Sequence, residues 1–246
     1  MERSYADVYR TLHERHWWWR ARESYLLGWL ERLRPAGGFG PILDVGCGAA
    51  LWFDRLRAFG EPEGLEGDAA LAAAAAERDR ARVYAQPFDE RFQPGKRYGL
   101  VLMLDVLEHI EDDRAALRHV ASLLAPGGLL VVTVPAFEAL WTGHDEINAH
   151  HRRYTAKGVA RVAADAGLAV LHRRYFFNSL ALPKLAVATL ERLRPRPPAH
   201  PPLLFGALNE LARRWCLLEQ RTWGKLPLPF GSSALLVARG PGEAGG

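Results

Sequence analysis

The sequence predicts an α/β fold built on a doubly wound, mostly parallel β-sheet, and three observations carry this prediction. Short apolar segments alternate with helical segments along most of the 246-residue chain, as they do in βαβ units. Residues 98–104 form a continuous apolar run, which is typical of a strand covered on both faces. A glycine turn at residues 46–48 follows the first strand, at the point where such sheets bind their ligands.

The first half of the chain opens with an amphipathic segment, and the breaker Pro35-Ala36-Gly37-Gly38 ends it. This segment predicts an N-terminal helical cap. Asp68 can cap a later, alanine-rich helix. The elements predicted in this half are the helical cap 1–34, the strand 41–45, a helix at about 50–59, the strand 64–66, the helix 69–78 and the strand 82–84.

In the second half, Leu117, Val120 and Leu124 fall on one helical face, and Pro126-Gly127-Gly128 ends that helix. The segments predicted around it are the strands 98–104 and 129–134, the helix 155–166, the strand 168–176 and the last strand, 233–239. The ligand-binding core therefore spans residues 35–176 and is completed by residues 232–240. Residues 241–246 are expected to be a disordered tail.

Two stretches interrupt the alternation. Residues 135–154 lack clear periodicity, and loops of this length in a compact domain are usually functional lids. Residues 177–231 are inserted before the last strand and predict two helices, near 180–193 and 203–220, around a proline-rich bend. The second of these helices carries an apolar stripe formed by Leu204, Leu208, Leu211, Trp215 and Leu218.

Composition excludes several classes of protein. Hydrophobic residues make up 49% of the chain, which is too many for a disordered chain, and no apolar run is long enough for a membrane-spanning helix. The two cysteines cannot build a disulfide framework or a zinc site, and no secretory signal is visible, so we expect a cytoplasmic protein. From residue 172 onward, 11 Lys+Arg oppose 4 Asp+Glu, so the net charge of +7 lies at the C-terminal end.

The chemistry is carried by the pattern Asp44-x-Gly46-x-Gly48 between the first strand and the first helix. The glycines allow a ligand to approach the backbone closely, and Glu66 ends the second strand, where a carboxylate can accept both ribose hydroxyls. A pyrophosphate dinucleotide fits poorly, because Leu51 stands at the last position of the dinucleotide pattern and Asp44 would repel phosphate. S-adenosylmethionine (SAM) is a cation without phosphate, so Asp44 would attract it instead of repelling it.

The chain resembles the Rossmann-type, class I SAM-dependent methyltransferases. The resemblance covers about residues 40–176. Within it, the segment from Leu104 to Ile110 is similar to methyltransferases of ubiquinone biosynthesis. This implies a seven-stranded sheet, SAM as cofactor and S-adenosylhomocysteine as product. The matching segments are Leu43-Asp44-Val45-Gly46-Cys47-Gly48, Gly64-Leu65-Glu66-Gly67-Asp68, Leu104-Asp105-Val106-Leu107-Glu108-His109-Ile110 and the run from Leu124 to Pro135.

The resemblance also implies roles by position. Asp44 would order the methionine end of the cofactor, Asp105 would line its methionine side, and His109 would face the cleft. Trp19 and Arg22 of the N-terminal cap would close over the cofactor, with Arg22 pairing its carboxylate. The remaining cofactor contacts would come from Gly46, Cys47, Gly48, Glu66, Gly67 and Gln86.

Three positions depart from the family pattern. Ala50 replaces a usual third glycine, Gly99 stands where relatives often have aspartate, and Gln86-Pro87 replaces the acid that usually accepts the adenine amino group. Gln86 can still accept through its amide oxygen.

The lid contains the candidate bases. An imidazole can take a proton from a substrate hydroxyl near neutral pH when a carboxylate orients it. His144 with Asp145, or His109 from the opposite wall, fit this role, although these side chains can equally tie down the lid. No spacing in the lid places two ligands on one face, so no metal is expected.

The expected activity is transfer of the SAM methyl group to a small-molecule acceptor, with a hydroxyl oxygen favoured over nitrogen or carbon. A non-catalytic SAM-binding protein and an NAD-dependent oxidoreductase are the rival readings, and nucleic acid is not expected as a partner. The apolar, basic insertion 177–231 is expected to receive a lipid-like substrate or to rest on an anionic membrane. A lid or a dimer face is the alternative, and monomer and homodimer stay open.

Overall fold

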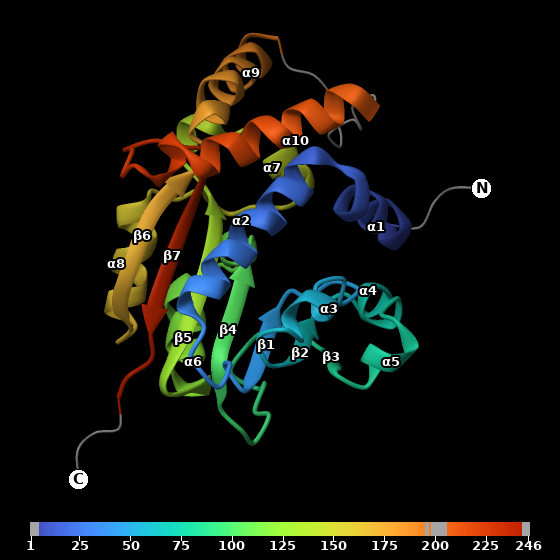
Figure 1. Ribbon diagram of the computed structural model, residues 1–246, viewed down its shortest axis with the longest axis vertical. Coiled ribbons are helices and arrows are strands. Elements are labelled where there is room, and N and C mark those ends of the chain that lie inside the picture. The colour runs from blue at the N-terminus through green and yellow to red at the C-terminus, as the bar shows by residue number, and fades with distance from the viewer. Residues whose placement is uncertain (1–4, 195–196, 198–205, 243–246) are drawn as a thin grey trace.

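The computed structural model describes residues 5–194, 197 and 206–242 (Figure 1). A seven-stranded sheet of order β3-β2-β1-β4-β5-β7-β6 forms its centre. β7 pairs antiparallel with both β5 and β6, and the other pairs are parallel, which confirms the predicted fold class. The strands are β1 (Pro41–Val45), β2 (Glu61–Glu66), β3 (Val83–Ala85), β4 (Tyr98–Leu104), β5 (Leu124–Pro135), β6 (Ala169–Phe176) and β7 (Ser233–Arg239).

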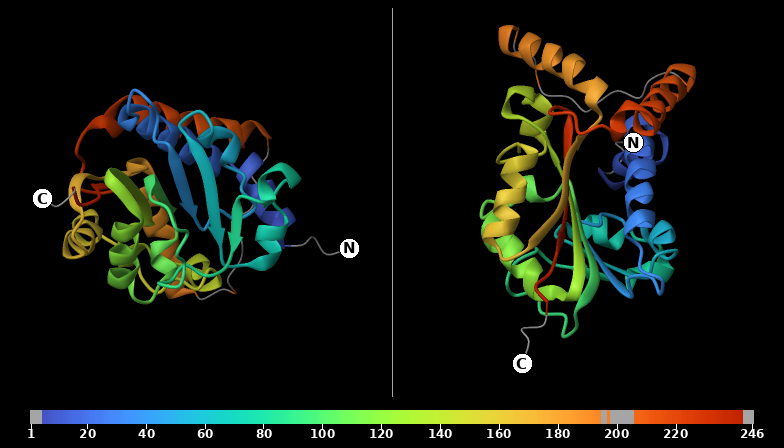
Figure 2. Two further views of the ribbon diagram at one scale, coloured as in Figure 1. Left: turned by 90° about the horizontal axis from the view of Figure 1, so that it is seen from below. Right: turned by 60° about the vertical axis from the view of Figure 1, so that its left-hand side comes forward.

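Helices cover both faces of the sheet, as the right-hand view of Figure 2 shows. Alternate residues of β4 divide between the two faces. Leu100 and Leu102 are buried in one apolar cluster, and Val101 and Met103 are buried in the other, so the strand is apolar throughout. The helices that contribute to these clusters are α2 (Trp17–Leu33) and α3 (Phe53–Leu56) on one face, and α6 (Asp113–Leu123) and α8 (Ala156–Asp165) on the other.

Three predicted helices differ in detail from the observed ones. The N-terminal cap consists of α1 (Tyr5–Arg15) and α2, and the imidazole of His16 between them accepts from the Trp18 N–H. The helix predicted at 50–59 shortens to α3, because Ala50 adopts a left-handed conformation that keeps the chain in the turn. The helix predicted at 69–78 divides into α4 (Ala69–Ala73), which Asp68 caps as predicted, and α5 (Glu77–Arg80).

The lid and the insertion lie at the carboxyl ends of the parallel strands (Figure 1). Within the lid, the 3₁₀ turn η2 (Glu138–Leu140) precedes α7 (Gly143–Ile147). The insertion forms α9 (Ala181–Leu193) and α10 (Gly206–Arg221), which diverge in Figure 2 and are called the crown below. Glu191 of α9 accepts from the Gly143 N–H at 2.9 Å, and Asn209 of α10 accepts from the Trp17 N–H at 3.0 Å. The crown is therefore anchored to both the lid and the cap.

Parts of the insertion and the tail lie outside the described residues. These parts include most of the proline-rich bend, Leu204 of the predicted stripe and residues 243–246 of the expected tail. The short turns that complete the described chain are η1 (Leu107–His109), η3 (Asn178–Leu180) and η4 (Trp223–Lys225).

Gly99 leaves no room for a side chain. A Cβ at this position in β4 would lie 1.9 Å from the backbone oxygen of Phe39. We expect Gly99→Ala to lower the free energy of unfolding by about 1–3 kcal/mol through overpacking. Chemical denaturation measures this, with Gly37→Ala as the control, because a Cβ at Gly37 meets no atom within 4 Å. Equal stability of the two variants would contradict the packing argument.

Candidate active site

The turn after β1 is shaped to let a ligand approach the backbone. Gly46 and Gly48 have φ angles of +71° and +55°, which residues with side chains rarely adopt. A Cβ at Gly46 would lie 2.6 Å from a methyl group of Val106. Ala50 continues the turn at φ +54°, so replacing the usual glycine leaves local backbone strain of about 1–2 kcal/mol. The turn therefore requires glycine at both positions, two and four residues after Asp44.

Asp44 is a buried carboxylate that forms no hydrogen bond or ion pair with any residue the structure describes, and it is 5% exposed. Burial raises its pKa to about 7, although the positive charge of Arg22 acts in the opposite direction. A buried charge of this kind is costly unless an opposite charge meets it. The site therefore suits a ligand that brings a cationic group to Asp44.

Glu66 closes the neighbouring side of the turn. Its carboxylate accepts from the Gly48 N–H at 2.8 Å and from the Asp68 N–H at 2.9 Å, which fixes it at the end of β2. Gly67 lies against Pro87, because a Cβ there would be 3.7 Å from the Pro87 Cα atom. The segment after β3, which contains the exposed Gln86, thus lies beside the Glu66 turn.

Cys47 is buried between these elements and packs against Gly64, where a Cβ would lie 2.3 Å from its sulfur. Burial raises the pKa of the Cys47 thiol, so this residue contributes packing rather than a thiolate.

Arg22 of the cap reaches the end of β4. Its guanidinium lies 2.7 Å from the Asp105 carboxylate, donates to the Thr133 hydroxyl at 3.1 Å and stacks over the Trp18 ring at 5.5 Å. Its buried Nε has no partner, and Asp105 adopts φ +57°. A ligand carboxylate would satisfy that donor. Trp19 is half-buried and packs edge-on against Trp18 at 4.8 Å between ring centres.

The lid places a buried ion pair beside this wall. Arg153 donates to both oxygens of Asp145, at 2.9 and 2.7 Å, and Asp145 also accepts from Thr142. The same carboxylate lies 2.8 Å from Nδ1 of His150. Burial favours the neutral acid, but the bonds from His150 and Arg153 outweigh it and hold the pKa of Asp145 below its usual range. Asp145 therefore stays anionic and orients the His150 ring.

His144, the ring that Asp145 was expected to orient, instead lies beside Asn148 on α7. The sequence suggests pairing Asp145 with the adjacent His144 rather than with His150 of the same lid, because nothing in the lid sequence indicates that the chain turns back after α7.

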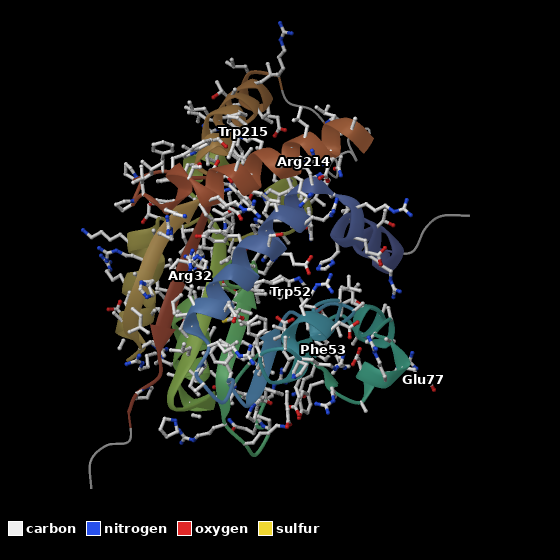
Figure 3. All side chains as sticks on the ribbon, in the orientation of Figure 1. Arg32, Trp52, Phe53, Glu77, Arg214 and Trp215 are labelled. Atoms are coloured by element: carbon white, nitrogen blue, oxygen red, sulfur yellow. The ribbon has the colours of Figure 1, made fainter. Side chains whose placement is uncertain are left out.

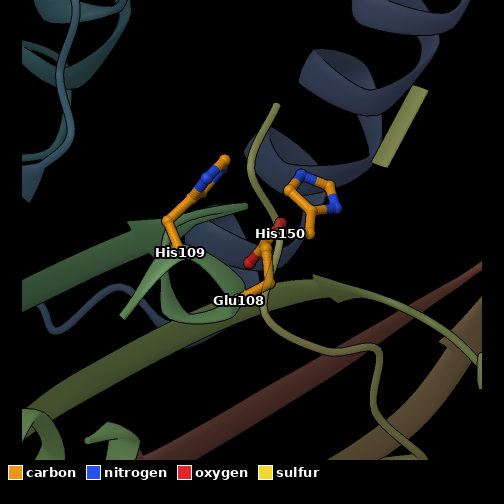
Figure 4. Close-up of side chains that lie close together, drawn as sticks. All are labelled: Glu108, His109 and His150. Atoms are coloured by element: carbon orange, nitrogen blue, oxygen red, sulfur yellow. The ribbon is translucent and has the colours of Figure 1, made fainter. Parts of the chain in front are cut away.

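Glu108 and His109 face His150 from η1 (Figure 4). The His109 and His150 rings meet edge-on at 4.6 Å. Glu108 is fully buried, and neither of its carboxylate oxygens has a hydrogen-bond partner. Burial and the nearby Asp105 charge raise the pKa of Glu108 well above its usual value. The sequence pattern alone assigns no role to Glu108, although this residue lies in the matching segment from Leu104 to Ile110.

Lys184 of α9 is a further residue that sequence reasoning missed. Its charged neighbours are Arg153, Asp145 and Asp105, and burial lowers its pKa to about 8. The crown therefore supplies a cation to the same wall.

The sheet order and the residues at the strand ends together define the class of fold. A mostly parallel sheet of this order, with a glycine turn directly after a buried carboxylate and an acid at the end of the second strand, is typical of folds that bind a nucleoside at the switch point of the sheet. Residues 18–173 match the family model described as "Methyltransferase domain". The chain belongs to this methyltransferase family, and its fold is that of the Rossmann-like methyltransferases.

Individual proteins agree with this assignment. The chain is 38% identical over 99 residues to a ubiquinone biosynthesis O-methyltransferase of Bradyrhizobium sp. strain ORS 278, a match that covers 37% of this chain and 38% of that protein. A Haloferax volcanii methyltransferase solved in complex with the Trm112 activator superposes with a TM-score of 0.63 at 19% identity, covering 98% and 96% of the two chains. A SAM-dependent methyltransferase of Mesorhizobium loti gives a TM-score of 0.57 at 17% identity, covering 85% and 95%.

The residues around the glycine turn fit SAM. Asp44 offers an unpaired buried carboxylate to a cation, and Arg22 offers an unpaired buried donor to a carboxylate. SAM carries both groups at its methionine end. Among the described helices, none is long and apolar enough to cross a membrane.

Proposed function

We propose that the enzyme methylates a hydroxyl oxygen of an apolar or lipid-linked small molecule. SAM supplies an activated methyl group on its sulfonium. The acceptor oxygen loses its proton and forms a bond to the methyl carbon as the carbon–sulfur bond breaks, which leaves neutral S-adenosylhomocysteine. The task of the protein is to align the two reactants and exclude water, and positioning alone can supply about 7–11 kcal/mol.

The cofactor is held, in this proposal, by the residues of the glycine turn and the cap. Asp44 and Arg22 take the amino and carboxylate groups of the methionine end, with Asp105 beside them. Glu66 takes the ribose. The remaining contacts come from Gly46, Cys47, Gly48, Gly67, Gln86 and Trp19.

Activation of the acceptor hydroxyl is placed at the wall formed by His109 and the Asp145–His150 pair. This wall adjoins Asp105, whose charge acts on both Glu108 and His109. The proposal takes His150 in place of His144, because Asp145 bonds to His150.

The proposal that the acceptor is apolar or lipid-linked rests on the surface of the crown. Its apolar side chains, which an ordinary lid would bury, are exposed: Leu211 by 64% and Leu193 by 75%. Exposed apolar surface of this extent usually marks an interaction site. The side chains that form it are Leu182, Leu185, Val187, Leu190 and Leu193 of α9, and Leu208, Leu211, Trp215 and Leu218 of α10 (Figure 3 labels Trp215).

The occupant that we assign to this surface is an anionic membrane. The net charge of +7 from residue 172 onward complements anionic headgroups, and amphipathic helices rich in arginine lie in such interfaces. The crown stands at the same end of the parallel strands as the glycine turn, so a membrane against it would present a lipid-linked acceptor to the site.

A double substitution tests the crown. Leu190→Ser with Leu211→Ser is expected to weaken binding to phosphatidylglycerol-containing vesicles by at least about tenfold, because each buried leucine contributes about 1.5–3 kcal/mol. Vesicle flotation measures this. Methionine at the same two positions is the control and should bind as the unchanged chain does, since it keeps the apolar area. Failure of the unchanged chain to bind these vesicles at low salt would remove the membrane assignment.

A further inference from the structure

Glu108, His109 and His150 form a cluster of potential metal ligands. The proposed activation of the acceptor hydroxyl by the two histidines gives Glu108 no role. One ligand atom from each lies within 4.8 Å of the other two (Figure 4). The cluster joins two segments far apart in sequence, η1 and the end of the lid. A divalent ion holds such ligands at about 2.0–2.2 Å, so small side-chain rotations would close the set around one ion.

The unpartnered carboxylate of Glu108 is the first independent sign of a ligand. It is 0% exposed, and neither oxygen accepts a hydrogen bond. Leaving a buried carboxylate without a partner costs several kcal/mol of desolvation. The positive charges of Arg22 and Arg153 reach Glu108 only as long-range electrostatic interactions. Arg22 forms its ion pair with Asp105, and Arg153 forms its ion pair with Asp145. A cation between Glu108 and the two imidazoles would remove this cost.

The surroundings of the two histidines are the second sign. Metal-bound histidines almost always give their other ring nitrogen to a carboxylate or a backbone carbonyl, which fixes the ring. His150 gives Nδ1 to Asp145, and Arg153 in turn holds Asp145. The His109 ring lies close to the backbone of Asn148.

We propose that Glu108, His109 and His150 bind a divalent transition metal, with zinc as the reference ion. Two imidazoles and one carboxylate are the ligand set of zinc sites that keep an open coordination position. The open position would take the acceptor oxygen. The ion would lower the pKa of the bound hydroxyl so that its proton passes to solvent, which leaves an alkoxide or phenolate to attack the methyl carbon. This role rests on the proposed function, whereas metal binding itself does not.

Titration calorimetry with Zn²⁺ on chelator-treated full-length protein tests the site. One ion per chain is expected, and Glu108→Gln or His150→Asn should each weaken it by at least about tenfold. His151→Asn is the matched control, because this exposed neighbouring histidine is outside the cluster. Co²⁺ provides a spectroscopic readout, since its visible bands should appear in the unchanged chain and vanish in both ligand variants.

Thermal stability separates loss of the site from loss of the fold. Glu108→Gln keeps the size of the buried side chain and removes only its ionisable group, so we expect it to melt at or above the temperature of the metal-free parent and to show no rise with Zn²⁺. Binding of S-adenosylhomocysteine is measured on the same samples. Normal binding of this product without Zn²⁺ binding would overturn the metal site alone, and Zn²⁺ binding without product binding would overturn the proposed function alone. Zn²⁺ affinities of Glu108→Gln and His150→Asn equal to that of His151→Asn would also overturn the site.

Discussion

Asp44→Asn is expected to weaken the binding of S-adenosylhomocysteine by at least about thirtyfold. Removing one partner of a buried charge pair costs about 2–5 kcal/mol, and the amino group of the ligand would be left without its carboxylate. Calorimetry with the product measures this directly, without knowledge of the acceptor. Asp54→Asn is the control, because Asp54 is an exposed carboxylate on α3. Equal affinity in the two variants would contradict the role of Asp44.

The same substitution should stabilise the unliganded protein above pH 7. The pKa of Asp44 is raised from 3.8 to about 7 on folding, so its effect is absent below pH 4, where both states are protonated. Stability is then lost as the pH rises from about 4 to 7, because the unfolded chain ionises first. Asparagine removes this loss. A variant with lower affinity and higher stability is a combination that simple misfolding cannot produce.

The pH dependence of cofactor binding follows from the same carboxylate. Because the charged form of Asp44 meets the cationic ligand, the affinity should rise with pH up to about 7 and then level off. Asp44→Asn should flatten this dependence, which calorimetry across the range measures.

Arg153→Met is expected to lower the free energy of unfolding by about 3–5 kcal/mol, or roughly 10 °C in the melting temperature. Its side chain is 1% exposed and forms two bonds to Asp145 and one to the Ala136 carbonyl. Removing the guanidinium leaves Asp145 charged and buried. Because the pKa of Asp145 is held low, the stabilisation is fully present near pH 7 and is lost as the pH falls through that lowered value.

Calorimetric or fluorescence melting measures this loss. Arg152→Met is the matched control and should cost less than about 1 kcal/mol, since Arg152 pairs with Asp113 near the surface. Arg153→Lys should recover only part of the loss, because lysine cannot form the bidentate contact. A melting temperature of Arg153→Met equal to that of Arg152→Met would show that the pair does not hold the lid.

The elements that the sequence predicts best are the strands that are buried along almost their whole length. β4 and β7 match the predicted bounds, because an apolar run between breakers has no competing structure. The short helix α3 was missed as such because apolar periodicity cannot reveal the left-handed backbone at Ala50. The crown was predicted as two amphipathic helices, but whether their apolar faces are covered depends on the tertiary arrangement.

The cofactor side of the site was readable because its residues lie in contiguous motifs at strand ends. The activation wall was not, because it is assembled from η1, the lid and α9. Asp145 lies beside His144 in sequence but beside His150 in space. In the sequence, the only indication of the proposed metal ligands is the pair Glu108-His109, which closely follows a buried strand.

The central claim is that SAM binds over β1 with its sulfur directed at the wall of His109 and His150. A crystal structure of the S-adenosylhomocysteine complex tests this most directly. We expect the amino group against the Asp44 carboxylate, the ribose against Glu66, and the sulfur facing the two histidines beneath the crown. A product molecule with its sulfur turned away from that wall, or bound at another edge of the sheet, would contradict the account.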